Sequence, residues 1–219
     1  MRVGILGSGE VGQRLGGGLT QLGYTVKIGT RDPKKEELLE WISNHGGQEG
    51  IASSGTFAES SSFGDIIVLA TSWSGASNAI RLADPMNLEG KILIDVTNPL
   101  DFSKGVPPQL ALGHSDSAGE TIQRLIPKSK VVKAFNTVGS PHFVHPDFPN
   151  GGPPTMFICG NNEESKKFVT DNILGKFGWE TIDIGGIEGS RLLEPLAFLW
   201  ITYYFRNGTG EHAFKLLQK

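Results

Sequence analysis

One short segment constrains the fold of this chain more than any other. Gly7, Gly9 and Gly12 form a GxGxxG pattern that follows the apolar run Val3–Leu6 and opens the segment Val11–Leu22, whose leucines recur with helical spacing. In such a unit the first glycine turns the chain, the second leaves room for a pyrophosphate, and the third packs helix on strand. We therefore expect a dinucleotide site at the N-terminus of this helix. The alternative is a glycine-rich turn that binds no ligand.

Further apolar runs predict a parallel sheet. Tyr24–Gly29, Asp65–Ala70, Ile92–Val96 and Val131–Phe135 are short and largely continuous in apolar residues. Continuous runs are typical of strands covered on both faces, which occur in parallel sheets between two helical layers. The alternation of strands and helices is the doubly wound pattern. The predicted fold class is α/β, a Rossmann-type doubly wound parallel sheet with a small C-terminal helical region.

The end of the second strand indicates which dinucleotide is bound. It reads Gly29-Thr30-Arg31, without the acidic residue that binds a free ribose 2′-hydroxyl. Arg31 can stack on adenine and hold a 2′-phosphate beside the hydroxyl of Thr30, and Lys34 and Lys35 add positive charge. This pattern favours NADP(H) over NAD(H).

Asp32 provides the alternative to that interpretation. If Arg31 were only a solvated turn residue, Asp32 could bind the ribose one position late. We interpret Asp32 instead as the cap of a helix that starts with Pro33 and ends near Gly46-Gly47.

The remaining strand ends predict the rest of the cofactor site, because parallel sheets bind ligands beyond the carboxyl ends of their strands. These ends combine small polar groups with apolar surface, which suits a nicotinamide, its ribose and its carboxamide. The residues are Ala70, Thr71, Ser72 and Trp73 after one strand, Asn98 and Pro99 after the next, and Ala134, Phe135 and Asn136 after the third. Trp73 could line a second planar ring or simply pack in the core.

No side chain stands out as an acid/base catalyst, and no catalytic residue is assigned. His142 and His145 lie in a loop near the third strand end and could touch a substrate, although loop histidines usually have no such role. A nicotinamide site without an evident proton donor favours hydride exchange between two cofactors over carbonyl reduction.

A loop rich in proline and glycine predicts a boundary. Residues 139–154 contain five prolines and three glycines, which predicts a loop without regular elements and divides the chain into an NADP-binding domain, 1–138, and a smaller region, 139–219. Beyond it we expect a strand at Met156–Cys159 and a second at Trp179–Ile184, which can extend the same sheet. Between them a helix should run from a cap at Asn161 or Asn162 to Leu174, with Gly175 as its C-cap.

The last predicted helix, Ser190–Phe205, is apolar nearly all round and should therefore be buried. Pro195 predicts a kink or restart inside it, and Asn207-Gly208 predicts a left-handed cap. Because few C-terminal elements are available to cover this helix, we expect a homodimer that buries it at a two-fold interface.

Composition removes several classes of function. The 219 residues carry a net charge of −3, which gives no general attraction to nucleic acid or to an anionic membrane. A single cysteine, Cys159, forms no internal disulfide or thiolate metal site, and no other residues have the spacing of metal ligands. The apolar run Pro195–Phe205 is too short to span a bilayer, and the opening MRVGILGSG contains no basic leader. We expect a cytoplasmic protein without metal, nucleic-acid partner or membrane anchor.

Several segments together carry a family resemblance over essentially the whole chain. They are GILGSGEVGQRLGGGL, IGTR, KILIDVTNP, VVKAFN, ICG and SRLLE. The chain resembles the coenzyme F420-dependent NADP oxidoreductases of archaea and many bacteria, and the cytosolic domain of the STEAP metalloreductases. The tail RNGTGE is more like the deazaflavin enzymes, whereas the segments NPL at 98–100 and KAFN at 133–136 are more like the metalloreductases.

The resemblance implies a Rossmann domain, usually dimeric, with NADP(H) along the strand ends and a deazaflavin or flavin ring stacked on the nicotinamide. It implies that Ser8 to Val11, within the glycine motif, hold the pyrophosphate, that Thr30 and Arg31 hold the 2′-phosphate with help from Lys35, and that two segments frame the nicotinamide. The motif residues are Gly7, Ser8, Gly9, Glu10, Val11 and Gly12; the 2′-phosphate residues are Thr30, Arg31 and Lys35; the framing residues are Asn98, Pro99, Ala134, Phe135 and Asn136.

Three functions remain open from the sequence. The first is an oxidoreductase that exchanges hydride between NADP(H) and coenzyme F420 or a flavin such as FMN or FAD. The second is an NADPH-dependent reductase of another small acceptor at the same site. The third is an NADPH-binding sensor without turnover, which would need affinity but no framing of the nicotinamide by Asn98, Pro99 and Asn136.

Overall fold

The computed structural model describes residues 1–46, 50–149 and 151–219, and one eight-stranded sheet forms its centre. The strand order is β3-β2-β1-β4-β5-β8-β9-β10. The strands are β1 Arg2–Leu6, β2 Thr25–Gly29, β3 Ala52–Gly55, β4 Ile66–Leu69, β5 Ile92–Asp95, β8 Lys130–Lys133, β9 Thr155–Gly160 and β10 Glu180–Asp183. The six from β3 to β8 run parallel in the Rossmann order, which confirms the predicted fold class.

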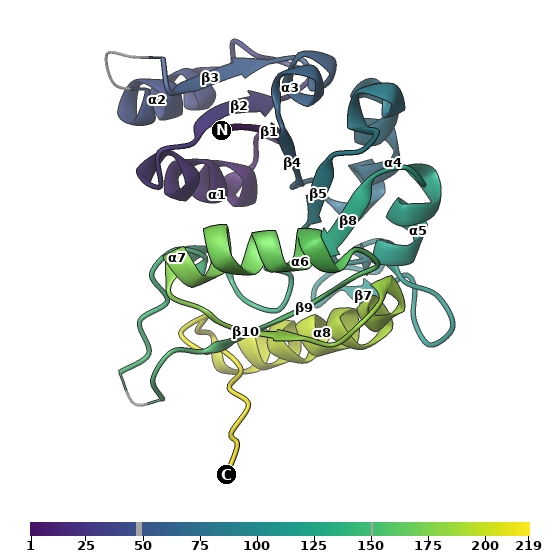
Figure 1. Ribbon diagram of the computed structural model, residues 1–219. Helices are drawn as coiled ribbons and strands as arrows, with labels where there is room; N and C mark the ends of the chain where they lie inside the picture. The colour runs from purple at the N-terminus through teal and green to yellow at the C-terminus, as the bar shows by residue number, and fades with distance from the viewer. Residues whose placement is uncertain (47–49, 150) are drawn as a thin grey trace.

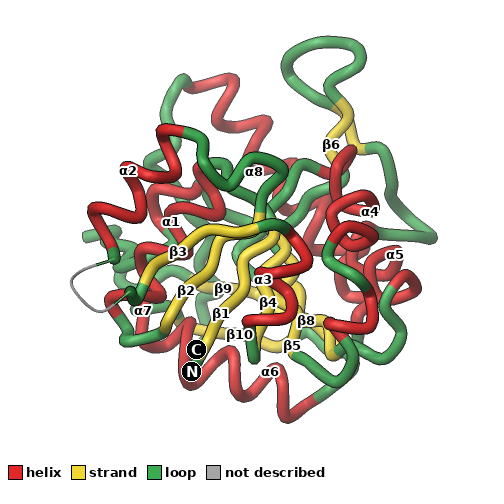
Figure 2. The backbone as a smooth tube through the Cα atoms, turned by 90° about the horizontal axis from the view of Figure 1, so that it is seen from above, coloured by secondary structure: helices red, strands yellow, loops and turns green. Residues whose placement is uncertain are grey.

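Two helical layers cover the sheet (Figure 2). The helices along the first six strands are α1 Glu10–Gln21, α2 Glu36–His45, α3 Phe57–Phe63, α4 Trp73–Leu82 and α5 Ala118–Leu125. Side chains alternate along the strands: in β4, Ile66 and Val68 join the core under α1 and α2, whereas Ile67 and Leu69 join the core under α3, α4 and α5. Both faces of the sheet are thus buried, as continuous apolar strands require.

The sequence analysis did not predict several elements that are short or polar. Strand β3 reads Ala-Ser-Ser-Gly and has no apolar run. Helix α3 begins with a capping box in which the side chains of Thr56 and Glu59 each accept from the other's backbone N–H. A small hairpin of β6, Leu100–Asp101, and β7, Gln109–Leu110, projects from the body of the molecule (Figure 2).

Helix α2 starts later than predicted. It begins at Glu36, and the side chain of Asp32 accepts a hydrogen bond from the backbone N–H of Lys34 at 3.1 Å. Asp32 therefore closes a turn around Pro33 and does not cap the helix, which corrects the expectation for both residues. The helix ends at His45 with Gly46 as its C-cap, as expected, and Gly47 lies outside the described residues.

Residues 139–219 continue the same sheet. Strand β9 pairs antiparallel with β8, and β10 pairs parallel with β9 (Figure 1). Helix α6, Glu163–Val169, is capped by Asn162, continues as a π-helix over Thr170–Leu174, and ends in α7, Gly175–Phe177. Its left-handed cap is Gly178, with φ 98°, so the prediction of Gly175 as the cap is wrong. The loop at 139–154 contains a 3₁₀ turn at Ser140–His142, which the sequence did not predict.

The last helix, α8, covers Ser190–Asn207 and passes through Pro195 without a restart, before the predicted left-handed cap at Gly208. Leu193, Glu194 and Ala197 are buried, but Leu192, Leu199 and Tyr203 are 69%, 57% and 51% exposed. This chain alone therefore covers only part of the helix, and burial of the rest by a second copy stays a prediction. No helix in the described part of the chain is both long and apolar enough to cross a membrane.

Candidate functional site

The candidate site lies at the carboxyl ends of the parallel strands. Neighbouring strands β1 and β4 lead into α1 and α4, which cover opposite faces of the sheet (Figure 2). This reversal of direction opens the crevice in which doubly wound sheets bind their ligands. The crevice therefore begins with the loops that follow β1 and β4.

The glycine motif holds the first of these loops in place. Gly7 has φ 130°, and a Cβ on it would lie 2.2 Å from the carbonyl oxygen of Ala70. A Cβ on Gly12 would lie 2.1 Å from the carbonyl oxygen of Gly7. A Cβ on Gly9, by contrast, would meet nothing within 4 Å, and its φ of −76° suits any residue. The fold explains Gly7 and Gly12, whereas no contact among the described residues requires glycine at position 9.

Two helix N-termini face the crevice without side-chain caps. The capping position of α1 is Gly9, which has no side chain, and that of α4 is Ser72, whose hydroxyl accepts no hydrogen bond from a backbone N–H of its helix. The loop before α1 is held by the amide of Gln13, whose Nε2 donates to the carbonyl of Ser8 at 3.0 Å. The free N–H groups and positive ends of both helices suit the phosphates of a dinucleotide.

A cluster of hydroxyl and ammonium groups lies at the end of β2. The Ser8 hydroxyl donates to the Thr30 hydroxyl at 3.0 Å, and Lys35 Nζ lies 3.2 Å from the carbonyl oxygen of Ser8. Lys35 also pairs with Glu37 at 3.2 Å, and Arg31 is exposed beside Thr30. Two of the three residues predicted to meet a 2′-phosphate, Thr30 and Lys35, thus contact the glycine loop, although they are 22 and 27 residues from Ser8 in sequence.

Asn98 and Asn136 join the ends of β5 and β8. Asn98 Nδ2 donates to the carbonyl of Asn136 at 2.8 Å, and Asn136 Nδ2 donates to Asn98 Oδ1 at 3.1 Å and to the carbonyl of Leu193 at 3.1 Å. Both partners of Nδ2 are acceptors, which fixes the orientation of the amide. Oδ1 of Asn136 is then a buried acceptor without a partner among the described residues, as is the hydroxyl of Thr71. These two atoms suit a ligand that offers hydrogen bonds at the strand ends.

Other predicted residues are packed within the protein itself. The Phe135 ring packs in the core against Phe143 and Phe177, at centroid distances of 5.3 and 6.2 Å. Pro99 is buried, and its carbonyl accepts from Ala111 at the base of the hairpin. Trp73 packs against the core under α4, which favours the packing interpretation over the ring-lining one.

A buried ionic network beneath the strand ends was missed by the sequence prediction. Lys133 Nζ lies 2.9 Å from Asp95 Oδ2, 2.9 Å from Glu194 Oε1 and 2.6 Å from the carbonyl of Thr97. Burial lowers the pKa of Lys133, but the two carboxylates outweigh it and raise the pKa above its ordinary value. A signal was present: Asp95 and Lys133 are the last residues of two adjacent strands, each directly after an apolar pair, and they occupy the same register position.

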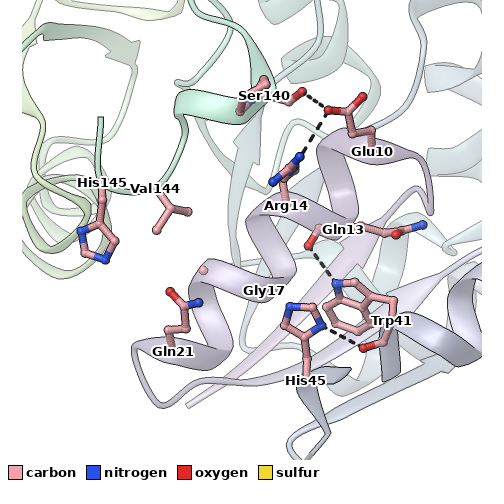
Figure 3. A pocket seen from close by; sticks show the side chains of 12 residues that line it. Glu10, Gln13, Arg14, Gly17, Gln21, Trp41, His45, Ser140, Val144 and His145 are labelled. Carbon is pink, nitrogen blue, oxygen red and sulfur yellow. Dashed lines mark hydrogen bonds and ion pairs between the residues drawn. The ribbon is translucent and has the colours of Figure 1, made fainter. Parts of the chain in front are cut away.

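A separate hollow of about 560 Å³ runs along the outer face of α1 (Figure 3). Val144 and His145 lie on one side of α1, and Trp41 and His45 lie on the other. Of the predicted cofactor residues this pocket includes Glu10, whose carboxylate accepts from the Ser140 hydroxyl at 2.9 Å. It is therefore distinct from the crevice at the strand ends.

His142 and His145 make different contacts. His142 packs on Phe148 with ring centroids 4.9 Å apart, and its Nε2 is 3.5 Å from Glu211 Oε2 in the C-terminal tail. His145 lines the pocket on α1. Over residues 1–46, 50–149 and 151–219, no three His, Cys, Asp or Glu side chains gather in a way that could hold a metal ion.

Comparisons with known proteins agree with this geometry. Residues 2–99 match the family described as NADP oxidoreductase, coenzyme F420-dependent. The F420-dependent NADP reductase of Methanocaldococcus jannaschii is 32% identical over 96% of both chains. A crystal structure of a candidate F420-dependent NADP reductase from Arthrobacter sp. FB24 is 36% identical and covers all of both chains with a TM-score of 0.92.

A second relative is much longer than this chain. Metalloreductase STEAP3 of Rattus norvegicus is 31% identical over 89% of this chain, which spans 36% of that protein. Full-length similarity therefore extends to the reductases and not to the metalloreductases. The chain belongs to the family of coenzyme F420-dependent NADP oxidoreductases, which are NADP-dependent enzymes with a Rossmann-like fold.

Proposed function

We propose that this protein exchanges a hydride between NADP(H) and coenzyme F420 in the crevice at the carboxyl ends of β1, β4, β5 and β8. The observation that carries the proposal is the cluster of Ser8, Thr30 and Lys35 beside Arg31, which offers hydroxyl and cationic groups to a 2′-phosphate. Full-length similarity to F420-dependent NADP reductases supports the choice of acceptor.

The chain's own residues would bind and orient the dinucleotide. The N–H groups that open α1 and α4 suit the pyrophosphate, and Gly9 leaves space for it. Asn136 Oδ1 is oriented to accept from an amide such as the nicotinamide carboxamide, and Asn98 holds Asn136 in that orientation. When bound, NADPH supplies the hydride itself, so that the protein's contribution is positioning and exclusion of water.

No side chain is required to move a proton in this proposal. Lys133 is fully buried and has three acceptors around its ammonium, and Asp95 is bonded to Thr97, so neither is free to exchange protons with a ligand. Hydride exchange between two rings needs their alignment, which can contribute about 7–11 kcal/mol to lowering the barrier.

Calorimetric titration of NADPH and NADH into the wild type and Arg31→Ala tests the cofactor. We expect the wild type to prefer NADPH by about 10- to 150-fold, equivalent to about 1.5–3 kcal/mol for a charge-assisted contact. Arg31→Ala should lose most of that preference with little change for NADH. Lys176→Ala is the matched control, because it removes an exposed positive charge from α7, outside the predicted cofactor residues, and should leave the preference unchanged. Equal affinities in the wild type would contradict the proposal.

Single-turnover oxidation of bound NADPH tests the acceptor. F420 should be reduced in a fast burst, whereas FMN at equal concentration should react much more slowly. A burst with FMN and none with F420 would exclude the deazaflavin and leave a flavin reductase. No burst with either acceptor, despite tight NADPH binding, would leave the sensor or a reductase of another small acceptor.

A further inference from the structure

The buried ionic network lies one residue away from each partner of Asn136. Lys133 binds the carbonyl of Thr97, and the next residue, Asn98, bonds to Asn136. Lys133 also binds Glu194, and the preceding residue, Leu193, gives its carbonyl to Asn136 Nδ2. One ammonium group therefore fixes the two segments that together hold the Asn136 amide.

Glu194 links this network to two helices. Its Oε2 accepts from the backbone N–H of Ala118 at 2.9 Å, and its Oε1 accepts from that of Gly119 at 3.0 Å. These N–H groups open α5, whose N-terminus carries partial positive charge. The Glu194 carboxylate thus holds the first half of α8 against both α5 and Lys133, and all the charged groups involved are buried.

Stability alone is a poor explanation for such a network. A buried ion pair seldom adds net stability over apolar residues of similar volume, because desolvation of the charges offsets their attraction. The network is directional, however: two of the three contacts of the Lys133 ammonium end on Thr97 and Glu194, each of which is next to an Asn136 partner. Asn136 Oδ1 takes no part in these contacts: it is buried and has no hydrogen-bond partner in the described structure.

We propose that Lys133, Asp95 and Glu194 are positioning residues that hold the Asn136 amide in the one orientation in which its free oxygen can accept a hydrogen bond from the dinucleotide's carboxamide. The proposal rests on the proposed function for the identity of the ligand. It assigns to the first half of α8 a role in cofactor binding although no α8 side chain belongs to the predicted site.

Glu194→Gln is the main test, since it keeps the shape of the side chain and removes its charge. We expect NADPH to bind about tenfold more weakly, the equivalent of one hydrogen bond made with poor geometry. Glu120→Gln is the matched control: Glu120 pairs with Arg191 at 2.5 Å and so also links α5 to α8, but it contacts no neighbour of Asn136. Glu120→Gln should bind NADPH with nearly unchanged affinity.

A double-mutant cycle separates positioning from a general loss of stability. In an Asn136→Ala background, Glu194→Gln should cause no further loss of NADPH affinity, because the group it positions is absent. All titrations are made well below each variant's melting temperature. Independent, additive losses would overturn the proposal.

A measurement without cofactor gives a second readout. The two side-chain N–H signals of Asn136 are identified by their loss in Asn136→Asp, and their exchange with water is followed by NMR. They should exchange slowly in the wild type and in Glu120→Gln but rapidly in Glu194→Gln. Slow exchange in Glu194→Gln, together with wild-type affinity for NADPH, would leave the network a purely structural role.

The neutral triple variant Asp95→Asn/Lys133→Met/Glu194→Gln is a control for destabilisation by an unpaired buried charge, because it removes all three charges together. It should fold and show the same weak binding and fast Asn136 exchange; normal binding and slow exchange would overturn the proposal. If the wild type bound no NADPH, the proposed function would fail, and the exchange experiment would still decide whether the network positions Asn136.

Discussion

The three glycines of the GxGxxG motif have different neighbours and therefore different reasons to be glycine. Gly7 and Gly12 are pressed against backbone carbonyls, whereas Gly9 has open space where its Cβ would be. We therefore expect substitution of Gly7 or Gly12 to lower the stability of the fold, and substitution of Gly9 to lower the affinity for the ligand.

We expect Gly9→Ala to change the free energy of unfolding by less than about 1 kcal/mol, because the reduced entropy of the unfolded chain offsets a poorer helix cap. The same substitution should weaken NADPH binding more than about tenfold, since the new methyl group takes up space that the fold leaves empty. Urea unfolding and calorimetric titration of one protein sample measure both quantities.

Gly12→Ala serves as the control and should destabilise the protein by about 1–3 kcal/mol through the clash with the Gly7 carbonyl. If Gly9→Ala destabilised the fold as much as Gly12→Ala and left NADPH affinity intact, the second glycine would be structural.

Substitutions of two histidines and one asparagine test whether catalysis depends on proton transfer by a side chain or on positioning of the cofactor. His142→Ala and His145→Ala should each cost less than about tenfold in single-turnover hydride transfer, because their contacts lie in the C-terminal tail and in the pocket on α1. Asn136→Leu should cost about a hundredfold or more, since a displacement of about 1 Å can have that effect. A thousandfold loss in a histidine variant beside an active Asn136→Leu would identify an acid/base carbonyl reductase instead.

At the scale of elements, α8 combines two environments in one helix. Its first half is held by Glu194 and Leu193, and its outer face carries an apolar stripe of Leu192, Leu199 and Tyr203. Residues seven and eleven positions apart lie on one side of a helix, so the stripe is continuous. We propose that a second copy of the chain covers it.

Light scattering during gel filtration should therefore give a dimer for the wild type at micromolar concentration. Leu199→Glu places a charge in the middle of the stripe and should produce a folded monomer, because burying an unpaired carboxylate is costly. Leu39→Glu is the control, as Leu39 on α2 is 49% exposed and far from α8 in sequence. A wild-type monomer, or dimers in all three proteins, would rule out this interface.

The elements show which parts of a fold can be recognised from sequence. Apolar runs identified β1, β2, β4, β5 and β8, because strands buried on both faces need little besides apolar side chains. Strand β3 and helix α3 were missed, since β3 is stabilised by pairing with β2 and α3 is short, although its capping box was visible in Thr56 and Glu59. The last helix was recognised, but its burial depends on neighbours that a helical pattern does not specify.

The sequence indicated the loops at the carboxyl ends of the strands, but it did not indicate the buried ionic network that lies below them. The glycine loop and Thr30 were recognisable because the motif fixes their places relative to each other. The contact of Lys35 with Ser8 fits that prediction. Glu194 could not be found in the same way, since it reaches Lys133 only after the chain has formed β9, β10 and α8. Long-range pairing of charged groups has no local pattern.

At the scale of the whole molecule, one sheet joins the two predicted regions. Strand β9 pairs with β8 across the predicted boundary, and Cys159 on β9 is buried with its Sγ 3.4 Å from the Ser190 hydroxyl. The division of the chain into residues 1–138 and 139–219 stays a prediction, and Cys159 can report whether the second region opens by itself.

Alkylation of Cys159 with iodoacetamide should require unfolding of the whole protein. The free energy of opening from labelling rates should match that from urea unfolding within about 10–15%, the uncertainty of the extrapolation. The physical reason is that β9 cannot leave β8 without breaking sheet hydrogen bonds and exposing the core. Labelling at a much lower free energy would show that residues 139–219 open as a separate domain.

The same thiol predicts a pH dependence. Burial raises the pKa of Cys159 from 9.0 to about 11. The unfolded thiol therefore ionises first, so its contribution to stability is complete below about pH 9 and is lost as the pH rises toward 11. The free energy of unfolding of the wild type and of Cys159→Ala should be measured from denaturation curves at several pH values between about 9 and 11. As the pH rises, the free energy of unfolding should fall more steeply for the wild type than for the variant. Parallel curves would contradict the assigned pKa.

The two contacts of α8, one with Asn136 and one with the proposed second copy, connect cofactor affinity to the concentration of the protein. In the proposed dimer, the exposed apolar stripe of α8 contacts a second copy, while the Leu193 carbonyl of the same helix bonds to Asn136. Mass action then connects the two events: ligand binding that favours a fixed α8 also favours association, and association favours binding by the same factor. The apparent affinity for the dinucleotide would accordingly rise with the concentration of the protein itself, and a thermodynamic constant for this protein has meaning only with that concentration stated.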